Sequence, residues 1–255
     1  MLGLSNGIGY TGEDISDIIP PSSYSMRFDG AGDFLAITET SFPIELTGED
    51  LSISFWCKRD SDDGDASCIL GLSGTASYSR LHFNTDGDAL DIESDQNGES
   101  ANADVTADTN WHHYVVTCRG LGTGSGGASV VTIYEDGAPA SGMCMTHLVT
   151  APTAGCNFGN SVDKDITFDR IGSDSGGGTT ELKGILYQLA IFDIVLTPDV
   201  VKTMYNIGTP ISIDNMSGIL HHWKFSENTG STTADSVGSL TATLNGDASF
   251  TSTTP

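Results

Sequence analysis

Basic residues are scarce in this chain, and that scarcity excludes several classes of partner. The 255 residues include 10 Lys and Arg but 34 Asp and Glu, which gives a formal net charge of −24 at pH 7. Proteins that bind nucleic acid or anionic membrane surfaces need clustered Lys and Arg to contact phosphates. Apart from Lys58-Arg59 the basic residues stand singly. We therefore expect no nucleic-acid partner, and we interpret the acidity as a device for solubility, with divalent-cation binding as the alternative.

Long apolar runs are also missing. No stretch reaches the roughly 18 apolar residues needed to cross a bilayer, which predicts no membrane insertion. The first basic residue is Arg27, and the apolar segment around Ile18-Ile19 is broken at once by Pro20-Pro21. A secretion signal has a basic start and a longer apolar core. We therefore expect the protein to be assembled in a cytoplasm and not exported by the general secretory route.

Paired cysteine motifs are absent as well. The odd count of cysteines leaves at least one thiol unpaired, and no two are spaced as CxxC; they are Cys57, Cys68, Cys118, Cys144 and Cys156. Small disulfide-stapled domains have a different pattern. The favoured interpretation is reduced core thiols, and a single bridge between Cys57 and Cys68 remains the alternative.

What the chain does have is a series of short apolar or alternating segments separated by glycine-rich turns. Alternation with a period of two is typical of strands, and many short strands with Gly-rich turns indicate a β-sandwich. No Pro-rich or charged linker divides the chain. We expect an arm over residues 1–23, either docked or disordered, and one sandwich over residues 24–255. The clearest strand segments are residues 25–30, 51–56, 111–117, 131–137, and 171–172 leading into 184–187.

Turn and cap residues add local detail. Asn-Gly and Asp-Gly pairs tolerate the positive φ of tight hairpins, so Asp86-Gly87, Asp136-Gly137 and Asn245-Gly246 each predict a hairpin. One helix is expected after Leu196. Thr197 can cap it, Pro198 suits its first position, and Gly208 can end the segment.

The ordered strand segments, together with residues 196–206, resemble the laminin-G-like branch of the concanavalin-A-like jelly rolls. The resemblance implies an all-β fold, a two-sheet antiparallel jelly-roll sandwich with one short helix after the last core strands. Residues 220–228 and 234–238 resemble a segment that often precedes the first strand of such modules. Here they come last, so residues 216–255 are expected to close the sandwich.

Enzymes that share this fold set the first chemical test. Laminarinase-type enzymes carry a Glu-x-Asp-x-Glu strip on one strand, which directs alternate carboxylates into one cleft. The nearest string here is residues 89–93, where Ala89 takes the place of the nucleophile before Asp91 and Glu93. We therefore expect no enzyme. His112-His113 and His221-His222 do not indicate zinc, because adjacent strand residues point to opposite faces.

Calcium is the cofactor that the resemblance suggests. Laminin-G-like and pentraxin-like modules often bind it in loops at one end of the sandwich, through carboxylates and backbone carbonyls. Asp-rich turns also arise simply because Asp hydrogen-bonds its own backbone, so this alternative stays open. The candidate ligands are Asp62, Asp63, Asp65, Asp163, Asp165 and Asp174.

Two functions follow from these observations. The first is a non-enzymatic virion structural protein, since residues 220–238 resemble tails of structural proteins in marine bacteriophages. It would sit on the virion surface after assembly in the host cytoplasm, as capsid decoration, head fibre or tail adhesin. Its partners would be other capsid or tail proteins and further copies of itself. The alternative is a calcium-dependent, lectin-like module for carbohydrate binding, for example to a host-surface glycan.

Overall fold

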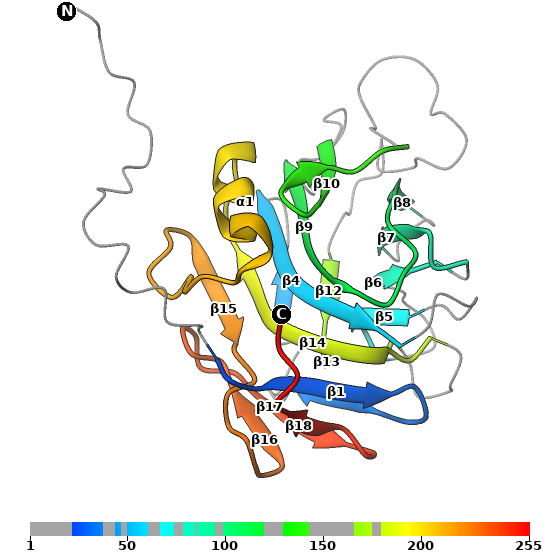
Figure 1. Ribbon diagram of the computed structural model, residues 1–255, viewed down its shortest axis with the longest axis vertical. Coiled ribbons are helices and arrows are strands. Elements are labelled where there is room, and N and C mark those ends of the chain that lie inside the picture. The colour runs from blue at the N-terminus through cyan, green and yellow to red at the C-terminus, as the bar shows by residue number, and fades with distance from the viewer. Residues whose placement is uncertain are drawn as a thin grey trace, which may run out of the picture.

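The fold is a sandwich of two antiparallel sheets, as the sequence predicts (Figure 1). The computed structural model describes residues 22–37, 44–46, 50–60, 67–73, 79–84, 86–94, 99–119, 130–142, 166–174 and 180–255. Of the predicted arm, only Ser22 and Ser23 fall within these ranges. No helix in the described part is long and apolar enough to cross a membrane.

Sheet A has eight strands among the described residues. β15 (Ile219–Trp223) pairs with the second half of β14, beside the main path. The path runs through β11 (Ala138–Pro139), β10 (Val130–Glu135), β9 (Trp111–Arg119), β4 (Leu51–Arg59), β14 (Lys183–Phe192), β1 (Ser25–Asp29) and β18 (Ser249–Thr251).

Sheet B also has eight described strands. A separate small sheet has two described strands. The small sheet pairs β3 (Ile44–Leu46) with β12 (Ile166–Phe168). Sheet B runs through β16 (Thr232–Ala234), β17 (Thr241–Asn245), β2 (Phe34–Ile37), β13 (Arg170–Ile171), β5 (Ser67–Gly71), β6 (Arg80–Phe83), β7 (Ala89–Ser94) and β8 (Glu99–Asp104).

The core lies between the two sheets and follows the strand alternation. On β4 the side chains of Ile53, Phe55 and Cys57 face inward, and on β9 those of Tyr114 and Val116 meet them. Complete burial of one such apolar side chain stabilises the fold by about 1.5–3 kcal/mol. The predicted strand segments at 51–56 and 111–117 thus supply the centre of the core.

β14 changes partner at a bulge. Its first half pairs with β1 and its second half with β15, while its pairing with β4 shifts register between Tyr187 and Ala190. Gln188 within this bulge has a φ of 50°, and its Nε2 donates to the carbonyl of Ile211 at 3.0 Å. The bulge lets one long strand serve two partners.

Two of the three predicted hairpins are confirmed. Asp86-Gly87 joins β6 to β7, and Asp136-Gly137, with φ values of 51° and 78°, joins β10 to β11. The prediction for Asn245-Gly246 is wrong. Gly246 does turn the chain, with a φ of 68°, but β17 belongs to sheet B and β18 to sheet A. A turn signal fixes a local φ and does not determine which sheet the next strand joins.

The corner after β17 runs alongside the corner between β1 and β2, which also crosses from one sheet to the other. β17 pairs with β2 and β18 with β1. Asp33 joins the two corners, because its carboxylate accepts from the backbone N–H groups of Asp29 and Asp247. At Gly246 a Cβ would approach Oδ1 of Asp33 to 2.5 Å, so only glycine fits this close approach.

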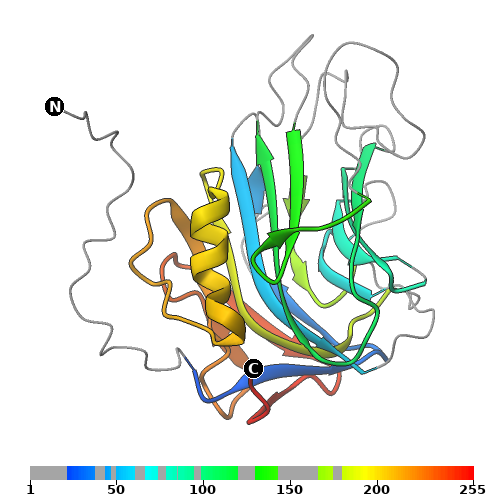
Figure 2. The ribbon, with the colours of Figure 1, turned by 45° about the horizontal axis from the view of Figure 1, so that its top comes forward.

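The α-helix in the described residues is α1 (Pro198–Tyr205), which packs on the outer face of sheet A (Figure 2). Thr197 caps it through its side chain, as predicted. The buried Val201 and Met204 lie in an apolar cluster with residues of β9, β10 and β14.

The helix ends earlier than Gly208, at a left-handed Asn206, and a short 3₁₀ turn follows (Asn206–Gly208). Ile207 in this turn also has left-handed angles (φ 55°, ψ 43°), and 92% of its surface is exposed.

The described cysteines are free thiols. Cys57, Cys68 and Cys118 are buried, and none forms a disulfide, so the alternative of a bridge between Cys57 and Cys68 is excluded. Cys57 faces the core from sheet A, and burial raises the pKa of its thiol to about 12. Such a thiol stays protonated and unreactive at neutral pH.

Candidate functional site

The candidate site is built by the hairpin of β6 and β7. Leu81 and Phe83 point into the core, so Arg80 and His82 point to the outer face of sheet B. The register pairs Arg80 with Glu93 and His82 with Asp91. β8 adds Asn102 opposite Asp91. We call the resulting surface the polar face; it consists of Arg80, His82, Asp91, Glu93, Asn102 and Asp174.

Arg80 is the organising cation of the polar face. Its Nε donates to Oε2 of Glu93 at 2.6 Å, and its Nη1 donates to Oδ2 of Asp174 at 3.1 Å. About a quarter of the side chain is exposed. Arg80 thus holds two carboxylates that come from different segments of the chain.

Asp174 reaches this position because Gly71 has no side chain. The segment Ser173–Asp174 lies directly on β5 at that point, and a Cβ on Gly71 would come within 2.4 Å of Cα of Asp174. Asp174 also accepts a hydrogen bond from the hydroxyl of Thr180. The absence of one methyl group therefore lets a loop carboxylate join the strand residues.

His82 has one ring nitrogen with no partner. Nδ1 lies 2.9 Å from the carbonyl oxygen of Phe83, which can only accept, so Nδ1 carries the proton. Nε2 lies 3.5 Å from Oε1 of Glu93 and makes no hydrogen bond, although the residue is only 5% exposed. A buried acceptor without a donor costs about 1–3 kcal/mol. Such atoms are rare in folded proteins and call for a cause.

The two carboxylates of β7 have opposite electrostatic surroundings. Burial raises the pKa of Asp91, although His82 and a hydrogen bond with Asn102 oppose the rise. Burial would also raise the pKa of Glu93, but the neighbouring His82 and the hydrogen bond and charge of Arg80 outweigh it and lower that pKa to about 2. Glu93 is therefore an anion throughout the physiological range.

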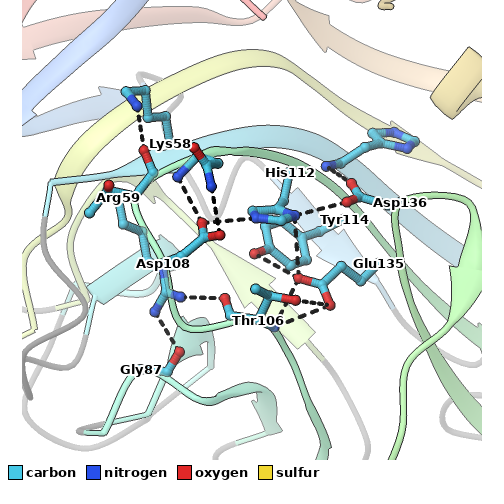
Figure 3. Close-up of polar contacts among 12 residues, drawn as sticks. Lys58, Arg59, Gly87, Thr106, Asp108, His112, Tyr114, Glu135 and Asp136 are labelled. Atoms are coloured by element: carbon cyan, nitrogen blue, oxygen red, sulfur yellow. Dashed lines mark hydrogen bonds and ion pairs between the residues drawn. The ribbon is translucent and has the colours of Figure 1, made fainter. Parts of the chain in front are cut away.

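A second polar cluster closes one end of the sandwich. It surrounds His112 at the start of β9, and Figure 3 shows the imidazole between Asp108 on one side and Glu135 and Asp136 on the other. Nδ1 lies 2.9 Å from Asp136 and Nε2 lies 3.0 Å from Asp108, so both nitrogens donate. The hydrogen bond to Asp136, with help from Asp108 and Glu135 and against burial, raises the pKa of His112 to about 9.

This end cluster fastens the loop that connects β8 to β9 across the two sheets. Glu135 accepts from the backbone and the hydroxyl of Thr106, and Arg59 donates to the carbonyls of Gly87 and Thr106 (Figure 3). Every charged group named here has a partner within the protein. We therefore assign the end cluster a structural role.

The remaining histidine pairs behave as strand alternation predicts. His113 is buried on the opposite side from His112, and its Nε2 lies 2.9 Å from the hydroxyl of Ser54. His221 pairs with Asp235, and His222 pairs with Asp214. In the described part of the chain no three His, Cys, Asp or Glu side chains lie close enough to hold one metal ion.

The predicted calcium ligands are only partly placed. Asp62, Asp63, Asp65, Asp163 and Asp165 lie outside the described residues. Asp174 is described, and it lies beside Arg80 and Thr180 in the polar face. The structure thus brings one predicted calcium ligand together with Asp91 and Glu93, the residues tested above against the glucanase strip.

Arg80, His82 and Asn102 were missed by the reasoning from sequence. The signal for the first two was present: across the Asp86-Gly87 turn, a basic pair at alternate positions faces an acidic pair at alternate positions. Opposite charges on facing strand positions stabilise a hairpin. Nothing local indicated Asp174 as their neighbour.

Comparison with known proteins is consistent with this architecture. A laminin-G-type family model, described as "Concanavalin A-like lectin/glucanases superfamily", matches residues 29–202. The chain belongs to this superfamily. The polar face lies within the matched region. A search of curated proteins gave no match.

Solved structures share the fold at low sequence identity. A proposed carbohydrate-binding protein from Bacteroides ovatus aligns with a TM-score of 0.59 and 15% identity, over 89% of this chain and 59% of that one. The chain therefore spans little more than half of that protein. A pentraxin from Limulus polyphemus gives a TM-score of 0.43 at 16% identity, over 72% of this chain and 82% of that one. A botulinum neurotoxin serotype D/C binding domain gives 0.42 at 16% identity, over 72% and 47%.

Proposed function

We propose that this superfamily member is a non-catalytic carbohydrate-binding module whose ligand lies on the polar face of sheet B. The observation that carries the proposal is Nε2 of His82, a buried acceptor without a hydrogen bond that lies 3.5 Å from Oε1 of Glu93. A ligand hydroxyl or amine would supply the missing donor. Sugar sites combine a few such polar groups with an apolar contact surface.

The face continues beyond the hairpin with groups that suit a sugar ring. Pairing across sheet B places Ala36, Arg170, Gly71, Arg80 and Glu93 in one row. The guanidinium of Arg170 lies 4.3 Å from the centre of the ring of Phe34. An aromatic ring flanked by hydrogen-bond donors is a suitable neighbour for a sugar.

Two properties of the polar face support binding without cleavage. A glycosidase needs a second carboxylate at the nucleophile position and a general acid that holds its proton near neutral pH. Ala89 occupies the first position, and Glu93, with a pKa of about 2, has no proton to give. Release of reducing sugar from a β-glucan, and its loss in Glu93→Gln, would contradict this part of the proposal.

A glycan array followed by isothermal titration calorimetry tests the proposal. We expect saturable binding of at least one glycan to the wild-type chain. His82→Phe keeps an aromatic ring but removes both ring nitrogens, and it should weaken binding roughly tenfold because a buried hydrogen bond to the ligand is lost.

Asp86→Asn is the matched control. It lies in the turn of the same hairpin, its residue is exposed, and Asn-Gly serves the turn as well as Asp-Gly. We expect unchanged affinity. The proposal fails if no glycan binds or if His82→Phe binds as well as the wild type.

A place on a virus particle is the second candidate, favoured by the resemblance of residues 220–238 to tails of marine bacteriophage structural proteins. These residues include most of β15, which pairs with β14. Immunogold electron microscopy of purified particles tests the proposal. Label on heads or tails would support it, and particles without label would exclude it.

Calcium binding also stays a proposal, for the five aspartates outside the described residues and for Asp174. The ion pair of Asp174 with Arg80 competes with any metal for its oxygens. A rise in melting temperature with Ca²⁺ that EDTA reverses would support bound calcium. No shift at millimolar Ca²⁺ would argue against it.

A further inference from the structure

The polar face has more hydrogen-bond acceptor sites, on its three carboxylates and on Nε2 of His82, than donors. Nε of Arg80 is engaged with Glu93 and Nη1 with Asp174, and Asn102 is engaged with Asp91. The acceptor Nε2 of His82 has no donor. A ligand that brings donors therefore finds more partners here than a ligand that brings only acceptors.

The charge of the face points the same way. Three carboxylates, Asp91, Glu93 and Asp174, lie around the single guanidinium of Arg80. The whole chain carries a formal charge of −24, so its field adds to the local excess of negative charge. Uronate and sulfated sugars would be repelled. A cationic group would be attracted.

We infer that the ligand of the polar face carries a protonated primary amine, as in a hexosamine without an N-acetyl group, and that this amine lies between His82, Asp91 and Glu93. The inference rests on the proposed carbohydrate-binding function. An ammonium group has three donors and no acceptor, which matches what this surface lacks.

A bare metal ion fits the same place less well. Metal–ligand bonds of about 2.0–2.6 Å require three or more ligand atoms packed closely around one point. The described residues contain no such group of three. An ammonium reaches its acceptors over the longer distance of a hydrogen bond, about 2.8 Å, and tolerates a wider spacing.

Calorimetry at about pH 6, where the amine of a glucosamine unit is mostly protonated, tests the inference with three tetrasaccharides. These are β-1,4-linked glucosamine, its N-acetylated form and a tetra-uronate. We expect the amine form to bind roughly tenfold more tightly than the acetylated form, because acetylation removes a charge-assisted hydrogen bond. The uronate should not bind.

Variants distinguish binding at the polar face from a general attraction of the cationic sugar to an acidic protein. Glu93→Gln should abolish the preference for the amine, with Asp91→Asn as a second variant if the first does not fold by circular dichroism. Asp86→Asn, which removes the same charge outside the polar face, should keep the preference. Equal losses in Asp86→Asn and Glu93→Gln would overturn the inference.

The other outcomes are also decisive. Equal or tighter binding of the acetylated form would overturn the inference and leave carbohydrate binding intact. Absence of binding to all three sugars and to the glycan array would remove both. Displacement of the glucosamine tetramer by a lysine peptide of equal affinity, or by Mn²⁺ in a manner lost in Glu93→Gln, would assign the face to another ligand class and contradict the inference.

Discussion

His112 and His113 are neighbours in β9, yet they lie on opposite sides of sheet A and in opposite electrostatic surroundings. His112 lies among Asp108, Glu135 and Asp136, and His113 is buried beside Ser54, Trp56 and Tyr205. The carboxylates raise the pKa of His112 to about 9, and burial lowers the pKa of His113 to about 3. The two residues should therefore affect the free energy of unfolding at opposite ends of the pH range: His112 at alkaline pH and His113 at acid pH.

Replacement of His112 should reduce the decline in the free energy of unfolding at alkaline pH. A folded-state pKa above the unfolded value of about 6.5 stabilises the protein fully below pH 6.5, and this stabilisation is lost as pH rises towards 9. After allowance for solvent screening we expect the loss to be about 1–2 kcal/mol. In His112→Gln the free energy of unfolding in urea should vary much less between pH 6.5 and 9. Lys58→Gln, which removes a nearby positive charge, should keep the wild-type decline, and an unchanged decline in His112→Gln would contradict the assignment.

Replacement of His113 should instead reduce the decline in the free energy of unfolding at acid pH. Its folded-state pKa lies below the unfolded value, so the unfolded chain binds the extra proton and stability falls as pH drops from 6.5 towards 3. Between pH 6.5 and 4.5 this amounts to about 2 kcal/mol. We expect His113→Gln to be less stable overall but to lose less on acidification. Ser54→Ala removes the same hydrogen bond, keeps the imidazole and should retain the full acid loss.

Ile207 should be replaceable with a gain in stability. A β-branched residue in the left-handed region costs about 1–2 kcal/mol, and its exposed side chain offers little packing in return. Ile207→Gly should therefore raise the free energy of unfolding by about 1 kcal/mol. Lys202→Gly, at an exposed position within α1, should lower it by about 1 kcal/mol. Destabilisation by Ile207→Gly would show that the side chain makes contacts that outweigh the strain.

Gly71→Ala should disrupt the polar face by displacing Asp174. The new methyl group would overlap Asp174 and push the segment Ser173–Asp174 off β5, which separates Asp174 from Arg80. Overpacking of this kind costs about 1–3 kcal/mol. Thermal melting measures the cost, and calorimetry should show weaker glycan binding. Ala36→Gly lies in the same row of sheet B and tests whether any small change there has the same effect. A Gly71→Ala protein of wild-type stability would mean that the segment moves at no cost.

The parts of the structure that the sequence predicts are those governed by local chemistry. Asp136-Gly137 and Thr197-Pro198 each impose a backbone conformation that few other structures accommodate, so a turn and a helix start follow from them. Asn245-Gly246 imposes a turn too, but which sheet β18 joins depends on Asp33 and β1, more than 200 residues earlier.

In the candidate site, too, some residues can be predicted from local sequence and others depend on distant contacts. Asp91 and Glu93 stand out in the sequence because they alternate on one strand. Arg80 and His82 become visible only once the hairpin register is known. Asp174 joins them because Gly71 permits a close approach from a distant loop, which no local pattern encodes. The calcium prediction followed the family resemblance and the aspartates of the loops, and neither carries information about which carboxylate an arginine will hold.

The joined corners at Asp33 have a consequence for the order in which the protein can fold. β1 and β2 are translated long before β17 and β18, which pair with them. Until then the edges of both early strands stay open to other chains, and pairing over such a separation is slow. Translation of residues 241–251 is thus the event that gives β1 and β2 their missing neighbours, one in each sheet.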